Sequence, residues 1–171
     1  MTRQTNDENA RAHTTQMLGD IEVGRGRLDA AVARYEEAAR LFETQPSPMW
    51  TFLALWQAAQ IYFEQGQPEA ALALGRRHPG PWASGVRGTA YLLLKNELAA
   101  EKEFNARRAY LTPPMGEYLA GKNVDLERLQ AAAYAGRWQE VTAGWRQLGG
   151  NLRPPIALED GRGSLELGAL P

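Results

Sequence analysis

The side chains that most often do chemistry in enzymes are few in this sequence, and their spacing does not favour catalysis. The chain has no cysteine and only two histidines, His13 and His78, and neither histidine belongs to a cluster with metal-ligand spacing. Glu36 and Glu37 are adjacent, so on a helix their carboxylates point about 100° apart and cannot form a general acid–base couple. We therefore expect no catalytic residue, no metal and no cofactor, and we expect surface or capping roles for both histidines.

Two further features near the C-terminus are better explained by local structure than by a site. Glu159 and Asp160 are again adjacent carboxylates, and Gly161-Arg162-Gly163 is a short glycine-rich stretch. A glycine-rich phosphate loop leads into a helix whose N-terminus faces the anion, and no helical pattern follows this stretch. The stretch is predicted to be a turn, and the protein is not expected to be an enzyme.

Composition and charge are those of an ordinary soluble domain. The 171 residues are 44% hydrophobic, with a formal net charge of -1 from 19 basic and 20 acidic residues. A near-neutral chain does not attract phosphate backbones or anionic lipid over a distance, and Arg76-Arg77 and Arg107-Arg108 are interpreted as solvated helix faces. No apolar run approaches the roughly 18 residues of a membrane span, and the N-terminus lacks the apolar core of a signal peptide. We expect a soluble cytoplasmic protein that binds neither nucleic acid nor membrane.

Apolar residues at three- and four-residue steps predict helices along most of the chain. The clearest is 28–42, where apolar residues line one side and charged residues the other. Further helices are predicted over 11–23, 48–65, 68–76, 82–94, 97–111, 124–135 and 138–148. Breaks are predicted at 78–81 and 112–114, which carry prolines, with a single helical turn at 117–120 and Asn123 as the N-cap of the next helix.

The predicted helices form pairs, and each pair is joined by a short turn. The turn residues are Gly26, Gly66, Lys95 and Gly136, which follow one another at about 40, 29 and 41 residues. The mean spacing, about 37 residues, lies in the range of stacked helical repeats. The unequal spacing indicates a degenerate array.

The motifs of the first and third pairs identify a family that the chain resembles. These motif residues are Leu18-Gly19, Gly26, Ala31, Tyr35 and Ala38 in the first pair and Gly88, Tyr91, Ala100, Phe104 and Pro113 in the third. They resemble the tetratricopeptide repeat, which has Leu-Gly in its first helix and Ala-x3-Phe in its second. The second pair has Gly75 where the family has an aromatic residue, and the fourth has Val141-x3-Trp145. The resemblance covers roughly residues 11–150.

The resemblance implies an all-α fold, a right-handed stack of antiparallel helical hairpins known as an α-solenoid. It also implies a non-catalytic scaffold or adaptor that binds a peptide or a partner helix in a concave groove. Alignment with the family gives as groove candidates Gln16, Asp20, Val23, Trp56, Gln60, Phe63, Thr89, Leu92, Gln130 and Tyr134. The lysine and asparagine set with which some members hold a C-terminal carboxylate is missing, so that mode of binding is not expected.

The helix at 48–65 is apolar around nearly its whole circumference. Met49, Phe52, Trp56 and Phe63 share one stripe of it, with Gln60 on the same side, and Phe52 therefore joins the groove candidates. Two interpretations remain open. The stripe is a hydrophobic binding groove, since aromatic residues dominate interface energies, or it is a face that neighbouring helices or the chain's own tail cover.

The last segment, 151–171, changes pattern. Ile156 and Leu158 precede Asp160-Gly161, and Leu165 and Leu167 follow it, which predicts an extended or β-hairpin-like tail. The expected organisation is a flexible N-terminus at 1–10, a helical repeat domain at 11–150 and this tail. Two alternatives to the scaffold are a structural homo-oligomer whose tail docks on a neighbouring protomer and a helical ligand-sensing regulatory module.

Overall fold

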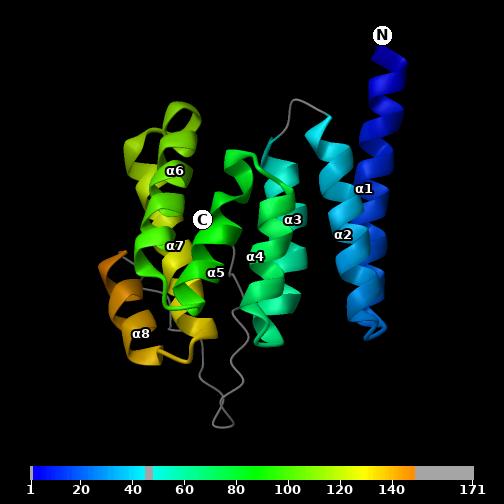
Figure 1. Cartoon of the computed structure of the whole chain (residues 1–171). Helices are drawn as coiled ribbons and strands as arrows, with labels where there is room; N and C mark the ends of the chain where they lie inside the picture. Colours follow the sequence, from blue (N-terminus) through cyan, green and yellow to red (C-terminus); the bar gives the residue numbers. More distant parts are fainter. Residues whose placement is uncertain (1, 45–47, 149–171) are drawn as a thin grey trace.

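The computed structural model describes residues 2–44 and 48–148, and the regular structure in those ranges is entirely helical (Figure 1). The elements are α1 (Thr2–Gly24), α2 (Leu28–Glu43), α3 (Pro48–Glu64), α4 (Pro68–Arg77), the 3₁₀ turn η1 (Pro81–Ala83), α5 (Ser84–Leu93), α6 (Glu97–Met115), α7 (Glu117–Tyr134) and α8 (Trp138–Gln147). The predicted all-α class is confirmed for this part of the chain. The predicted tail hairpin at 151–171 lies outside the described residues.

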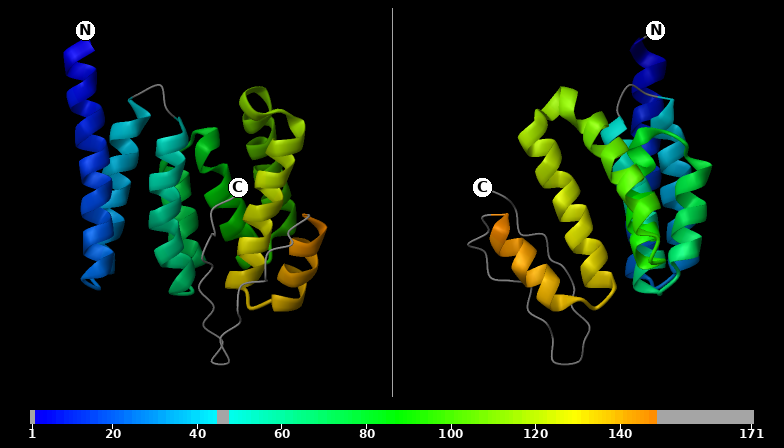
Figure 2. Two further views of the ribbon diagram at one scale, coloured as in Figure 1. Left: turned by 180° about the vertical axis from the view of Figure 1, so that it is seen from behind. Right: turned by 60° about the vertical axis from the view of Figure 1, so that its left-hand side comes forward.

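Consecutive helices form antiparallel hairpins that stand side by side (Figures 1 and 2). The pairs are α1 with α2, α3 with α4, α5 with α6 and α7 with α8, and the second helix of each hairpin also packs against the first helix of the next. The hairpins therefore stack in the order of the chain, and α1 forms one edge of the stack (Figure 1).

Every hairpin turns through a residue in the left-handed backbone region. The φ angles are 70° at Gly26, 68° at Gly66, 58° at Lys95 and 72° at Gly136. In each turn this residue donates its N–H to the carbonyl three positions back, and the next residue donates to the carbonyl five positions back, at 2.8–3.1 Å. This double hydrogen bond closes a helix C-terminus around a left-handed residue. The four predicted turns, including the one without glycine, are confirmed.

Replacing Lys95 by glycine is expected to raise the free energy of unfolding by about 0.5–1 kcal/mol. A side chain in the left-handed region costs about 1–2 kcal/mol, of which glycine's extra backbone entropy offsets a part. Lys95 is exposed, so little packing is lost. Urea unfolding monitored by circular dichroism measures the change. Lys102→Gly, in the middle of α6, is the matched control and should lose about 1 kcal/mol; a Lys95→Gly variant less stable than the parent contradicts the prediction.

The motif residues fit together as the family pattern requires. A Cβ on Gly19 would lie 2.5 Å from Cε1 of Tyr35, and a Cβ on Gly88 would lie 2.9 Å from Cε1 of Phe104. Only glycine lets the first helix of these two hairpins approach the aromatic ring of the second so closely. In the second hairpin, Gly75 stands in place of that ring, and the side chain of Arg87 from α5 fills the space against it.

The start of α1 and the end of α6 differ from the prediction. Helix α1 begins at Thr2 rather than Arg11. Helix α6 passes through Pro113 and Pro114 instead of ending before them. The fixed φ of proline is itself helical, and because both prolines lie in the last turn they remove only the hydrogen bonds that their N–H groups would donate to the carbonyls of Ala109 and Tyr110. Helix α6 ends at its C-cap residue Gly116, whose φ is 77° and whose N–H donates to the carbonyl of Thr112 at 2.8 Å.

The predicted cap at Asn123 is wrong. Helix α7 runs unbroken from Glu117 to Tyr134, and Asn123 lies inside it, where its side chain donates to the carbonyl of Leu119 at 3.0 Å. Ala120 and Val124 are both buried on the same face of α7. Packing of that face outweighs the weak preference of asparagine for a helix end.

Candidate functional site

The aromatic groove candidates form a row of ring contacts between α3 and α7. The ring centroids of Phe52 and Trp56 are 5.7 Å apart, those of Trp56 and Phe63 6.2 Å, and those of Phe63 and Tyr134 5.3 Å. Trp56 and Phe63 are only 8% and 4% exposed, and Phe52 and Tyr134 are half-buried. The row thus belongs mostly to the interior, which favours the interpretation that the stripe is covered. Thr89 is also fully buried.

A line of polar side chains, here called the amide strip, crosses from α1 over α3 to α7. Its members are Gln16, Asp20, Gln57, Gln60 and Tyr134. Gln16 donates to Gln57 at 2.6 Å, and Gln57 donates to Asp20 at 3.1 Å. Gln60 donates to the hydroxyl of Tyr134 at 3.5 Å, a long hydrogen bond. Gln57 is not among the groove candidates predicted from the sequence, although its place three residues before Gln60 puts both side chains near one face of α3.

The side chains of the amide strip are joined to one another and to Tyr35 by hydrogen bonds. The Tyr35 hydroxyl donates to Asp20 at 2.7 Å, and burial together with the nearby carboxylate raises the pKa of Tyr35 far above its usual value. Burial likewise raises the pKa of Tyr134. Both phenols are therefore neutral at pH 7, and Tyr35 donates to Asp20 whereas Tyr134 accepts from Gln60. Carboxamides both donate and accept, which is what a polypeptide backbone requires.

A buried ion pair joins α6 to α7. Arg107 donates to Glu127 at 3.0 Å, and the two side chains are only 5% and 7% exposed. The Arg107 guanidinium lies 3.9 Å from the centroid of the Phe52 ring. Gly85 of α5 leaves room for the carboxylate, since a Cβ there would lie 2.7 Å from Oε2 of Glu127. The interpretation of Arg107 as part of a solvated face is wrong, whereas its neighbour Arg108 is exposed.

The Glu127 carboxylate is held in an environment that disfavours its charge. Burial raises its pKa, and the positive charge and hydrogen bond of Arg107 act in the opposite direction. One of its oxygens, Oε2, is buried without a hydrogen-bond partner among the described residues. The neighbouring Gly85 and Phe52 supply packing but no donor side chain, so Arg107 alone keeps this carboxylate stable in the interior.

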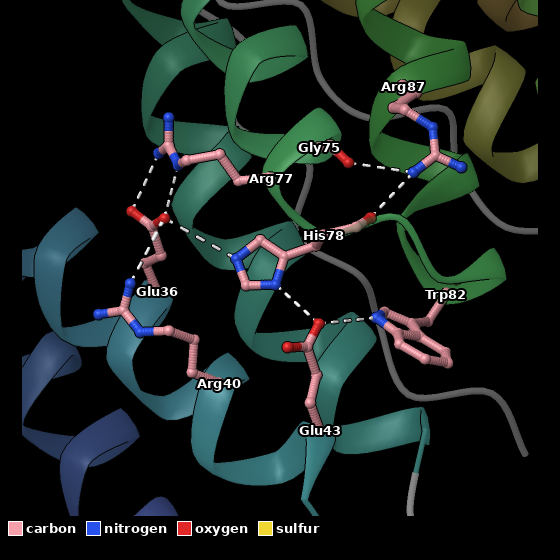
Figure 3. A network of polar contacts seen from close by, with 8 residues as sticks. All are labelled: Glu36, Arg40, Glu43, Gly75, Arg77, His78, Trp82 and Arg87. Atoms are coloured by element: carbon pink, nitrogen blue, oxygen red, sulfur yellow. Dashed lines mark hydrogen bonds and ion pairs between the residues drawn. The ribbon is translucent and has the colours of Figure 1, made fainter.

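A second polar network surrounds His78 (Figure 3). Its Nδ1 lies 2.7 Å from Oε1 of Glu43, and its Nε2 lies 3.8 Å from Oε1 of Glu36. Arg77 holds Glu36 through two hydrogen bonds, at 2.7 and 3.0 Å, and thereby lowers the pKa of that carboxyl. Trp82 donates to the same oxygen of Glu43 at 3.3 Å. The network links α2 to the end of α4 and to η1.

The expected surface role of the two histidines is wrong, whereas the expected capping position is found for His78, which is the C-cap residue of α4. His78 is buried, and both of its ring nitrogens face carboxylates of the same chain, so the ring is tied into the stack. His13 is half-buried and packs edge-on against Phe42 and Trp50, with ring centroids 4.9 and 4.6 Å apart. Both residues join neighbouring helices.

An open cavity of about 690 Å³ lies among α6, α7 and α8. Its lining mixes both signs of charge, with Arg108, Lys122 and Arg128 opposite Glu117, Asp125 and Glu140. Arg128 already pairs with Glu101, and Lys122 donates to the carbonyl of Leu148 at 2.7 Å. A mixed and partly satisfied lining selects no particular ligand, so we assign none.

Residues 2–44 and 48–148 contain no group of three or more histidine, aspartate or glutamate side chains placed to hold a metal ion. Within the same ranges, no helix combines the length and the apolar character needed to cross a membrane.

Comparison with known proteins gives one family match. Residues 8–78, which extend from α1 to the end of α4 and His78, match the family model described as Tetratricopeptide repeat. The match includes the second hairpin, whose motif is the less regular of the two. No curated protein and no solved structure matches the chain significantly.

Proposed function

Since residues 8–78 belong to the tetratricopeptide repeat family, as their motifs predicted, we propose that this chain is a non-catalytic scaffold that binds another protein. Repeats of this family mediate protein–protein interaction, and stacked hairpins offer a long continuous surface for it. In this proposal the hairpins wind into a right-handed superhelix, and the protein works in the cytoplasm. The observation that carries it is the amide strip, a line of hydrogen-bonding side chains along the first helices of the hairpins whose bonds to one another could be exchanged for bonds to a partner.

We assign different roles to the candidate residues according to their burial. Gln60, Gln130, Phe52 and Tyr134 are half-buried and keep atoms at the surface, so these side chains would contact the bound segment. The buried candidates Trp56, Phe63 and Thr89 would support the groove from beneath.

The bound segment is proposed to be an extended peptide. An extended backbone presents N–H and C=O groups alternately at about 3.3 Å per residue, and carboxamides such as Gln57 and Gln60 can satisfy both. Asp20 is exposed beside them and carries a negative charge, which favours a basic residue in the peptide near α1.

The test is to select peptides from a displayed random library on the full chain and to measure the affinity of the selected sequence by calorimetry. Gln57→Ala together with Gln60→Ala is expected to weaken binding roughly tenfold, since each lost hydrogen bond is worth about 0.5–1.5 kcal/mol. The matched control is Gln139→Ala, an exposed glutamine at the other end of the stack on α8. Equal affinity of the folded double variant and the parent would show that the peptide binds elsewhere.

A further inference from the structure

Helix α1 carries an exposed face that is apolar at its centre. Met17, Leu18 and Ile21 are 64%, 39% and 46% exposed, and Ala10 and Thr14 lie exposed on the same side of the helix at three- and four-residue steps. The face points away from α2, because Gly19, on the opposite side of α1, lies against the ring of Tyr35. Exposed apolar side chains that are gathered on one face indicate an interaction site.

The equivalent face of the first helix is buried in each of the other hairpins. Counted back from the left-handed turn residue, Thr14 and Ile21 correspond to positions that are buried in each later hairpin. These positions are Ala54 and Ile61 in α3, Ala83 and Ala90 before and within α5, and Val124 and Ala131 in α7. Helices α3, α5 and α7 each pack on the second helix of the preceding hairpin. In α1 the corresponding surface has no preceding hairpin within the described chain.

We infer that this face pairs with α1 of a second copy of the chain, in an antiparallel and symmetric helix pair. Asp7 lies on the same side of α1 as Met17, and so does Arg25, the first residue after the helix, 18 residues or five helical turns further on. Arg25 also lies 3.9 Å from Glu22, which has Arg27 as its nearer partner, so this long contact leaves the Arg25 side chain available. A two-fold axis near Gln16 brings Asp7 of each copy to Arg25 of the other. Both side chains are exposed, so both can reach across.

The same register fits side chains of different size together. It sets Ile21 beside Ala10 of the other copy and Leu18 beside its Thr14, so that large apolar groups meet small ones and the two helices can approach closely. The remaining charges near the face are directed elsewhere. Arg11 pairs with Glu37 of α2 at 3.8 Å, and Glu22 pairs with Arg27 in the hairpin turn.

Head-to-tail stacking of copies through α8 does not fit the face. The exposed residues of α8 are Gln139, Glu140, Ala143, Arg146 and Gln147, of which only Ala143 is apolar, so α8 offers little apolar surface to Met17 and Ile21. An isologous pair also closes after two copies, as soluble oligomers commonly do. One helix of about 35 Å on each side is a small interface, for which a dissociation constant near the micromolar range is expected.

Sedimentation equilibrium of the full chain from about 1 to about 200 µM tests the inference. The parent is expected to dimerise, and Ile21→Glu is expected to weaken dimerisation at least tenfold, because it buries two carboxylates in the pair. Leu98→Glu is the matched control: Leu98 is 86% exposed on α6, and its replacement should change nothing. Circular dichroism confirms that each variant is folded.

A charge exchange distinguishes this pairing from any other. Asp7→Arg alone and Arg25→Asp alone are each expected to weaken dimerisation several-fold, because two like-charged contacts arise per dimer. The double variant with both exchanges restores the affinity to within about twofold. A parent that remains monomeric, a dimer that is insensitive to Ile21→Glu, or a double variant as weak as the single ones overturns the inference. None of these outcomes bears on peptide binding, because the amide strip lies on a different side of α1.

Discussion

Replacing Arg107 by methionine is expected to lower the free energy of unfolding by about 3–5 kcal/mol. The change leaves the carboxylate of Glu127 buried, with neither its ion pair nor its hydrogen bond. Methionine keeps most of the length and packing of the side chain, so the loss reports mainly on charge. Urea unfolding followed by circular dichroism at pH 7 measures it. Arg108→Met is the matched control, since Arg108 is exposed, and its replacement should change stability by less than about 0.5 kcal/mol.

The loss caused by Arg107→Met should depend on pH in a definite direction. Burial already raises the pKa of Glu127, and removing the opposing arginine raises it further. A carboxyl whose pKa is raised in the folded state stabilises that state when it is protonated, and this contribution is lost as the pH rises through the folded-state pKa. The variant's deficit is therefore expected to shrink as the pH falls from 7 toward the ordinary glutamate pKa of about 4.3.

A double variant distinguishes the destabilisation caused by an unpaired buried charge from the net contribution of the ion pair to the free energy of unfolding. Arg107→Met with Glu127→Leu replaces both charges by apolar groups and should recover most of the stability, because a buried ion pair contributes little beyond a well-packed apolar pair. If Arg107→Met is as stable as the parent at pH 7, the carboxylate is not buried as the structure shows.

The hairpin architecture could be predicted because its determinants are local. Each turn requires a residue in the left-handed backbone conformation between two helices. Glycine adopts this conformation readily, so Gly26, Gly66 and Gly136 predict the turns from the sequence. Lys95 could be placed only by its position between two helical patterns. Buried positions of α2 follow from three- and four-residue spacing alone, since this helix has one apolar side and one charged side.

Features that depend on distant contacts could not be predicted. Arg107 and Arg108 look alike in the sequence, and only the placement of α7 brings Glu127 to one of them. The histidine network has the same origin, because Glu43 and His78 lie on different hairpins. Long charged side chains are buried only when a partner from another element meets them, and spacing within one helix carries no information on that partner.

For the aromatic stripe of α3, the sequence predicts burial but not the residues that cover it. A helix that is apolar on all sides must be covered, and the sequence indicated this much. It could not show that Tyr134, two hairpins further along, meets Phe63. The polar neighbours Gln57 and Gln60 therefore become the better candidates for contact with a partner.

Replacing Phe63 by alanine is accordingly expected to destabilise the protein by about 3–5 kcal/mol. The ring is 4% exposed and contacts both Trp56 and Tyr134, so its removal opens a cavity between α3 and α7. Thermal unfolding should show a midpoint lower by about 6–20 °C, at about 2–4 °C per kcal/mol for a chain of this size. Met49→Ala is the control on the same helix: Met49 is 54% exposed, and its loss should cost less than about 1 kcal/mol.

Stability and peptide binding measured together decide what the stripe does. If Phe63 belongs to the core, Phe63→Ala lowers the unfolding temperature, and at a temperature where the variant is folded it binds a selected peptide nearly as well as the parent. The amide variants Gln57→Ala and Gln60→Ala should behave in the opposite way, with weaker binding and a smaller loss of stability, because their side chains are half-buried and the changes remove only hydrogen bonds to Gln16, Asp20 and Tyr134. A Phe63→Ala variant that keeps its stability and loses the peptide would instead make the ring part of the binding surface. The aromatic and the amide variants thus assign the two kinds of side chain on α3 to folding or to binding by independent measurements.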